Sequence, residues 1–136
     1  MIAADIITAA RSALGVRFRH QGRTMSGMDC AGLVVYVAQS LGLEYADHDG
    51  YARQPSGGLL ESALDVQPCL ERVKGPPQAA DVLLMKFDGD PQHLGIYTGS
   101  SLIHAWALAR KVCEHGFTDP WPGRVVRVYR FKGIES

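Results

Sequence analysis

The sequence lacks an excess of charge of either sign. Lysine plus arginine equals aspartate plus glutamate at 14 residues each, so the formal net charge over 136 residues is zero. Nucleic acids and anionic lipid surfaces attract proteins through clustered basic side chains, and this balance offers no such footprint. We therefore expect no nucleic-acid partner.

Long apolar runs are also missing. No stretch approaches the roughly 20 apolar residues that cross a bilayer, and the first residues lack the basic and apolar regions of a secretory signal peptide. We expect no membrane insertion. We expect the protein to be synthesised in a bacterial cytoplasm. Action outside that compartment would need a route other than a signal peptide.

Cysteine is scarce and unpaired in sequence. Cys30, Cys69 and Cys113 form an odd set, far apart and without a C-x-x-C pair, which disfavours a disulfide framework and predicts reduced thiols. The chain is 46% apolar and 21% charged, a globular balance. A length of 136 residues predicts one domain, residues 1–136, that buries a core without disulfides.

What the chain does have is a helix that begins at a cysteine. Apolar residues recur at helical spacing behind Cys30, and Gly42 ends the pattern. The unpaired N–H groups of a helix start favour a thiolate, so Cys30 is a candidate nucleophile. The alternative is a small buried apolar residue. Cys69 and Cys113 are interpreted as structural because neither lies at a recognisable helix start.

Helices dominate the first half of the chain and strands the second. Apolar periodicity predicts further helices over residues 5–14 and after Ser56, which is a candidate N-cap. Apolar runs bounded by turn residues predict strands. These runs lie at 81–87, 93–97, 102–106, 111–114 and 125–131, with turns at 88–91 and 98–100. Helices followed by strands predict an α+β fold with an antiparallel sheet.

Two histidines are candidate partners of the cysteine. His93 and His104 lie at nearly equal distances from the predicted turn at 98–100, so their side chains can approach within about 5 Å on one face of a hairpin. Gly95 leaves room there for another element, such as the Cys30 helix. Surface or half-buried structural histidines are the alternative. The even spacing of His93, His104 and His115 also permits a metal site, but no carboxylate or cysteine falls at a familiar ligand spacing.

Four segments resemble a known family. Residues 29–34 read D-C-A-G-L-V and are similar to the D-C-S-G-L-V box of the NlpC/P60 cysteine peptidases. Residues 93–99 resemble that family's H-V-G-I-Y-x-G box, and residues 102–105 resemble the segment that carries its third polar residue. Residues 81–83 are similar to its G-D-L strand. The boxes stand in family order across residues 15–105.

This resemblance implies a papain-like α+β fold, with N-terminal helices packed on a C-terminal antiparallel sheet. It implies that Cys30 is the nucleophile, His93 the base and then the acid, and His104 the residue that orients His93. Family members hydrolyse peptide bonds in peptidoglycan stem peptides, often the γ-D-glutamyl bond to a diamino acid. No metal or organic cofactor is implied.

Two positions depart from the family pattern. Ala31 replaces the usual serine, and Phe18 stands where many relatives carry a tyrosine, so stabilisation of the oxyanion falls to other groups such as the Cys30 backbone N–H. We take Phe18, His20 and Asp29 as candidate substrate-binding residues. Asp29 is also the natural cap of the Cys30 helix.

Residues 18–23 and the compact length resemble the phage and prophage tail members of the family. That resemblance implies tail-tip proteins as partners and action at a virion tail or in the periplasm. The alternative function is a non-catalytic tail-assembly or wall-binding module on the same fold, motivated by Phe18. A third candidate function is thiol-dependent acyl transfer to an amine.

Overall fold

The computed structural model describes residues 1–47, 58–87 and 91–135. The helices are α1 (Ala3–Arg11), α2 (Cys30–Ser40) and α3 (Leu59–Asp65). None of the helices in these ranges is long and apolar enough to cross a membrane. The predicted turn at 88–91 falls almost entirely outside the described residues.

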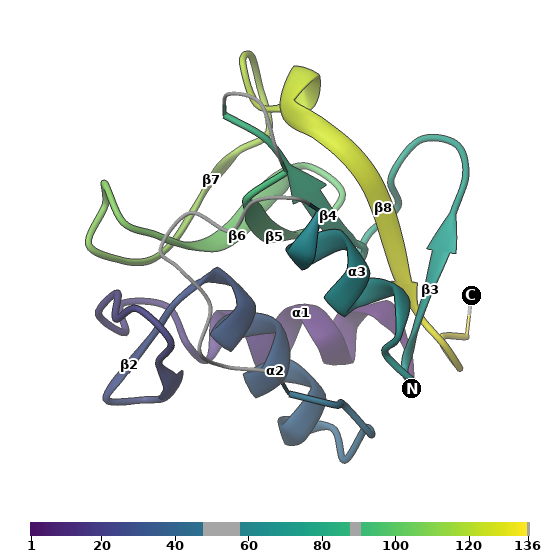
Figure 1. Ribbon diagram of the computed structural model, residues 1–136, viewed down its shortest axis with the longest axis horizontal. Coiled ribbons are helices and arrows are strands. Elements are labelled where there is room, and N and C mark those ends of the chain that lie inside the picture. The colour runs from purple at the N-terminus through teal and green to yellow at the C-terminus, as the bar shows by residue number, and fades with distance from the viewer. Residues whose placement is uncertain (48–57, 88–90, 136) are drawn as a thin grey trace.

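An antiparallel sheet forms the second half of the chain (Figure 1). Its strands run in the order β3-β8-β4-β5-β6-β7, and every neighbouring pair is antiparallel. The bounds are β3 (Leu70–Val73), β4 (Val82–Met85), β5 (His93–Tyr97), β6 (Ser101–Trp106), β7 (Lys111–Gly116) and β8 (Val125–Phe131). The predicted α+β fold is confirmed.

Four short elements escaped prediction. Strand β3 pairs with β8 at the sheet edge. A two-stranded pair, β1 (Arg23–Thr24) with β2 (Gly27–Met28), interrupts the loop that precedes α2, and a short 3-10 helix, η1 (Pro122–Arg124), precedes β8. Elements of two to four residues are too short to show a periodic apolar pattern.

Two of the predicted helix ends are wrong. Helix α1 ends at Arg11, and Leu14 is 41% exposed in the turn that follows. Helix α3 begins at Leu59 with Gly58 as its N-cap at φ +73°. Ser56, the predicted cap, lies outside the described residues. Gly58 fits there because a left-handed backbone costs a glycine little.

The sheet separates two apolar clusters. Helices α1 and α2 lie on one face of the sheet (Figure 1). The larger cluster joins them to that face and contains Leu94 and Ile96 of β5. The smaller one lies on the opposite face and contains Leu102 and Trp121. Because side chains alternate along a strand, His93 and Gly95 point toward the smaller cluster.

Gly95 therefore does not face the Cys30 helix, and that prediction is wrong. A Cβ at Gly95 would lie 2.6 Å from Leu102 Cδ1 and 3.1 Å from Met85 Cε. The space that the glycine leaves is filled from within the sheet. Helix α2 packs on the other face, against β5 and β6.

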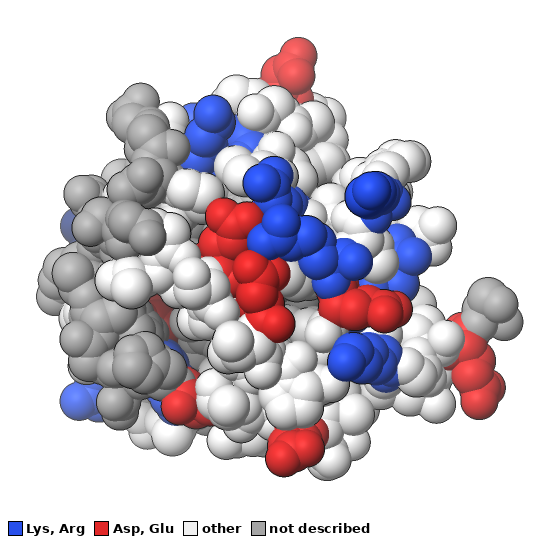
Figure 2. All heavy atoms as spheres, turned by 45° about the vertical axis from the view of Figure 1, so that its right-hand side comes forward, with Lys and Arg blue, Asp and Glu red and all other residues white. Residues whose placement is uncertain are grey.

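Charges of both signs alternate on the face formed by α3, β3 and β8. Arg72 pairs with Glu61 and Asp65 at 2.8 Å each, and Arg127 pairs with Glu61 at 3.0 Å. Figure 2, turned toward this side of the molecule, shows basic and acidic groups next to one another. Exposed pairs of this kind contribute little to stability individually, about 0–1 kcal/mol.

Candidate active site

Asp29 holds the start of helix α2. One carboxylate oxygen accepts a hydrogen bond from the Gly32 N–H at 2.8 Å, and the other accepts from the Gln21 N–H at 2.8 Å. Arg23 adds an ion pair at 3.0 Å. Asp29 is only 3% exposed. The prediction that it caps the helix is confirmed, and its carboxylate also ties the preceding loop to the helix.

Gly32 allows that loop to lie against the helix. A Cβ at this position would collide with the Gly22 carbonyl oxygen and would also crowd the Asp29 carboxylate. The glycine of the D-C-A-G segment is therefore required by the close approach of two backbones.

Cys30 and His93 line a single cavity of about 350 Å³. Helix α2 supplies the cysteine from its first residue, and β5 supplies the histidine from its first residue. Phe18, His20 and Asp29, the three predicted substrate-binding residues, line the same cavity. Leu60, Phe87, Trp106 and Leu108 add apolar surface to the wall. The cysteine and the predicted substrate-binding residues thus share one opening to solvent.

The Cys30 thiol is held in its neutral form. Burial raises its pKa to about 12, and the negative charge of Asp29 contributes in the same direction. Backbone N–H groups of Leu94, Ala31 and Cys30 oppose this rise. The helix start was expected to favour a thiolate. The structure gives the opposite direction because the loss of water around the sulfur outweighs the helix field.

His93 and His104 are joined by a short hydrogen bond. Nε2 of His93 lies 2.6 Å from Nδ1 of His104. Ile96 pairs with Ile103, so the same register places His104 opposite Gly95 and diagonal to His93 on the same face. The predicted approach of the two histidines is confirmed, with an offset of two residues.

Both imidazoles are neutral. Burial lowers the pKa of His93 to about 3, helped by the positive charge of Arg124. Burial also lowers the pKa of His104 to about 2, and the neighbouring His93 and His115 add to this effect. A neutral His93 is able to accept a proton, as a general base must.

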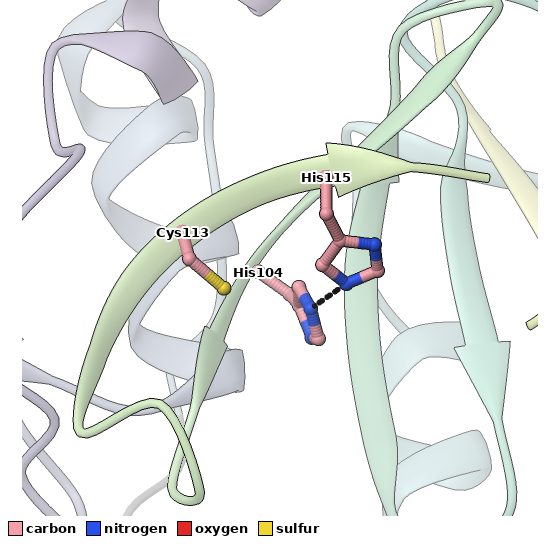
Figure 3. Close-up of side chains that lie close together, drawn as sticks. All are labelled: His104, Cys113 and His115. Carbon is pink, nitrogen blue, oxygen red and sulfur yellow. Dashed lines mark hydrogen bonds between the residues drawn. The ribbon is translucent and has the colours of Figure 1, made fainter.

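The line of histidines continues to His115. Nε2 of His104 lies 2.8 Å from Nε2 of His115, and Nδ1 of His115 lies 3.0 Å from the Gly116 carbonyl oxygen. Figure 3 shows the His104 and His115 rings turned toward each other from neighbouring strands. The spacing of 11 residues noted in the sequence places each histidine diagonal to the next across successive hairpins.

Aromatic rings enclose the histidines. Trp106 stacks on His104 with ring centroids 5.3 Å apart, and Trp121 meets the same ring edge-on at 5.0 Å. Phe87 lies 5.3 Å from His93. The Arg124 guanidinium carbon lies 4.7 Å from the centroids of both Phe87 and Trp121. This wall excludes water from the imidazoles, which is the cause of their lowered pKa values.

His104, Cys113 and His115 also bring three potential metal ligands together. One ligand atom from each lies within 4.8 Å of the others (Figure 3). Cys113 stands directly opposite His104 in the β6–β7 register, a proximity that sequence spacing did not reveal. Imidazole and thiolate are donors that zinc takes. In this structure the two Nε2 atoms bond to each other, so a metal would have to break that bond.

Sequence reasoning missed several residues around the site. Trp121 and Arg124 come from the segment before β8, which no local pattern places over β5 and β6. His115 was noted only as part of a possible metal spacing. Its one available signal was the 11-residue interval shared with His93 and His104.

Comparison with known proteins identifies the family. A sequence model described as "NlpC/P60 family" matches residues 15–130. The chain belongs to the NlpC/P60 family. The resemblance of its sequence boxes is thereby confirmed, and so is the fold class that the resemblance implied.

The similar proteins include curated relatives and solved structures. One curated relative is the "Probable peptidoglycan endopeptidase LytE" of Bacillus subtilis (strain 168), 26% identical over 101 residues. The match covers 74% of this chain but 26% of that relative's length. A NlpC/P60 family protein from Bacillus cereus ATCC 10987 has a TM-score of 0.68 at 18% identity, covering 96% of this chain and 40% of that one.

A third similar protein is RipD of Mycobacterium tuberculosis, described as "a non-catalytic NlpC/p60 domain protein". Its TM-score is 0.65 at 18% identity, covering 96% of this chain and 97% of that one. At this level of identity the likeness of structures shows a shared fold. A shared fold does not establish catalysis, which depends on the residues of the site in this chain.

Proposed function

We propose that this chain is a cysteine peptidase that hydrolyses peptide bonds in the stem peptides of bacterial peptidoglycan. The observation that carries the proposal is the common cavity of Cys30 and His93, with His104 hydrogen-bonded behind His93. Nucleophile, base and orienting residue are the three parts that thiol catalysis needs. The similarity to LytE supports peptidoglycan as the substrate.

In the first step the Cys30 sulfur attacks the scissile carbonyl carbon and its proton passes to His93. Nε2 of His93 is occupied by His104, so Nδ1 is the ring nitrogen that accepts the proton. Because the thiol and the imidazole are both neutral at rest, proton transfer accompanies the attack. The imidazolium that forms is stabilised by its hydrogen bond to Nδ1 of His104.

The developing oxyanion lies near the start of helix α2. N–H groups of the first helical turn carry partial positive charge and suit a developing negative charge. Phe18 lines the cavity but has no hydroxyl to donate, so the Cys30 backbone N–H is the donor we assign to this role.

His93 then acts as an acid. It gives its proton to the leaving amine as the C–N bond breaks, which leaves a thioester between Cys30 and the acyl part of the stem. A water molecule that loses a proton to His93 attacks the thioester carbonyl. Collapse of that intermediate releases the carboxylic acid and returns the proton to the Cys30 sulfur.

The bond we assign is the γ-D-glutamyl bond to a diamino acid, which the family resemblance implies. The test is release of the amine product from a synthetic stem peptide that contains this bond. Wild type is expected to release it and Cys30→Ala is not. Cys69→Ala is the matched control: it removes a buried thiol of the core and is expected to retain activity. Release of the amine product by Cys30→Ala would contradict the assignment, whatever the activity of Cys69→Ala.

We further propose association with a phage or prophage tail. The support is the resemblance of residues 18–23 to tail members of the family, together with the position of Phe18 and His20 on the cavity wall. Co-purification with tail-tip proteins from virions tests this. Recovery of the protein only from phage-free cell walls would contradict it.

A second candidate function is a non-catalytic wall-binding or tail-assembly module. Phe18 on the cavity wall favours it, because the family tyrosine is absent there. RipD gives the fold a precedent without catalysis. Wall binding that survives Cys30→Ala, with no product from wild type, would favour this candidate over the peptidase.

A further inference from the structure

A third histidine, which the proposed mechanism does not use, adjoins the His93–His104 pair. His115 lies on β7, is partly buried, and contacts His104 through its Nε2 atom at 2.8 Å. Its other ring nitrogen, Nδ1, lies 3.0 Å from the carbonyl oxygen of Gly116. In this last contact the donor and the acceptor can be assigned without knowing the tautomers of the other histidines.

A carbonyl oxygen accepts hydrogen bonds and cannot donate them. Nδ1 of His115 must therefore carry a proton, and in the neutral ring Nε2 is then an acceptor. His104 has to donate to it from Nε2, which leaves Nδ1 of His104 as an acceptor. His93 in turn donates from Nε2 and keeps Nδ1 unprotonated.

We propose that His115 is a positioning residue that, anchored on the Gly116 carbonyl, sets the tautomers of His104 and His93 so that Nδ1 of His93 is free to accept the Cys30 proton. The proposal rests on the proposed function for its consequence in catalysis. The tautomers themselves do not depend on any activity.

The surroundings of the line favour a single arrangement of protons. Trp106 and Trp121 pack against the His104 and His115 rings, with centroid distances between 5.0 and 6.1 Å. His104 has no exposed surface. With water kept from its nitrogens, the protein partners determine which nitrogen carries the proton.

Without the His115 acceptor, a second tautomer becomes available to His104. Its proton can move to Nδ1, where it would donate to Nε2 of His93. His93 would then carry its own proton on Nδ1 and would be unable to take one from Cys30. A base held in the wrong tautomer is inactive although all residues remain in place.

Nitrogen-15 NMR of uniformly labelled wild-type protein tests the tautomers directly. We expect an unprotonated Nδ1 and a protonated Nε2 for His93 and the same pattern for His104, with Nδ1 protonated in His115. The opposite pattern in His93 would overturn the proposal. Because this spectrum is independent of turnover, a correct tautomer in an inactive protein would contradict the peptidase assignment and leave this inference standing.

Two variants separate positioning from mere packing. His115→Phe removes the acceptor and keeps an aromatic ring, and we expect kcat to fall on the order of 10-fold with little change in KM, together with a protonated Nδ1 in His93. His115→Gln supplies an amide oxygen as acceptor and is expected to restore kcat to within about 3-fold of wild type. Equal activity in both variants, or an unchanged His93 tautomer in His115→Phe, would overturn the proposal. Should His115→Phe fail to fold, the wild-type spectrum still overturns the proposal if Nδ1 of His93 carries the proton.

Discussion

Nε2 of His93 lies 2.6 Å from Nδ1 of His104, and this contact leaves Nδ1 of His93 as the ring nitrogen available to the thiol. A histidine whose far nitrogen is occupied in this way acts through its near one. The pair thus defines a direction for proton movement, from Cys30 into the imidazole.

Replacing His104 tests the pair. His104→Ala is expected to lower kcat by roughly 100-fold, because His93 loses the partner that orients it and stabilises its cationic form. His104→Asn keeps a short polar side chain and is expected to recover part of that loss. Steady-state kinetics on the synthetic stem peptide measure both. Equal kcat values for His104→Ala and wild type would remove His104 from the mechanism.

The reactivity of Cys30 reports its protonation state. Since burial raises the thiol pKa to about 12, we expect the rate of alkylation to keep rising above about pH 10, whereas an ordinary thiol with a pKa of roughly 8.5 has levelled off by then. Peptide mapping by mass spectrometry separates Cys30 from Cys69 and Cys113. A rate that is already maximal at pH 7 would show that Cys30 is a thiolate. It would contradict the neutral resting forms of Cys30 and His93.

Stability is expected to fall in mild acid. The pKa values of His93 and His104 are lowered from 6.5 to about 3 and about 2 on folding. The unfolded chain therefore binds more protons below pH 6.5, so the free energy of unfolding decreases as the pH drops from 6.5 toward 3. Denaturant titrations at successive pH values measure the slope. His104→Asn should flatten it, and an unchanged slope in that variant would contradict the assignment.

Asp29 is expected to act mainly on stability. Asp29→Ala removes the cap of α2 and the bond to Gln21, at a cost of about 1–2 kcal/mol in the free energy of unfolding. Asp29→Asn retains an oxygen for the Gly32 N–H and should cost less. Chemical denaturation compares the two. A large effect on KM with unchanged stability would instead assign Asp29 to substrate binding.

Chelation tests whether a metal takes part. The proposed steps use only Cys30, His93, His104 and backbone groups, so dialysis against a chelator is expected to leave kcat unchanged. The His104–His115 bond should persist in the same sample, with the same imidazole tautomers by NMR. Loss of activity that added zinc restores would contradict the mechanism and assign a metal to the cluster of His104, Cys113 and His115.

The sequence predicted those parts of the site that depend on local pattern. Helix α2 follows from apolar spacing behind Cys30, and the meeting of His93 with His104 follows from a hairpin with a short turn. Asp29 could be recognised as a cap because capping involves residues close in sequence.

Features that depend on tertiary packing were not predictable. The thiol pKa rises because distant segments remove water from Cys30, an effect that no local motif reports. Gly95 was expected to face α2, but strand alternation turns it toward Leu102 and Met85. Trp121 and Arg124 reach the histidines from a segment about 30 residues beyond His93, where only the folded sheet brings them together.

The central claim is that Cys30 cleaves peptidoglycan stem peptides. The most direct measurement is mass spectrometry of muropeptides after purified cell walls are incubated with wild type or with Cys30→Ala. The account predicts shortened stems with wild type alone, with masses that match cleavage after the γ-D-glutamyl residue. Intact stems from walls of several chemotypes, with both proteins shown to be folded, would contradict it.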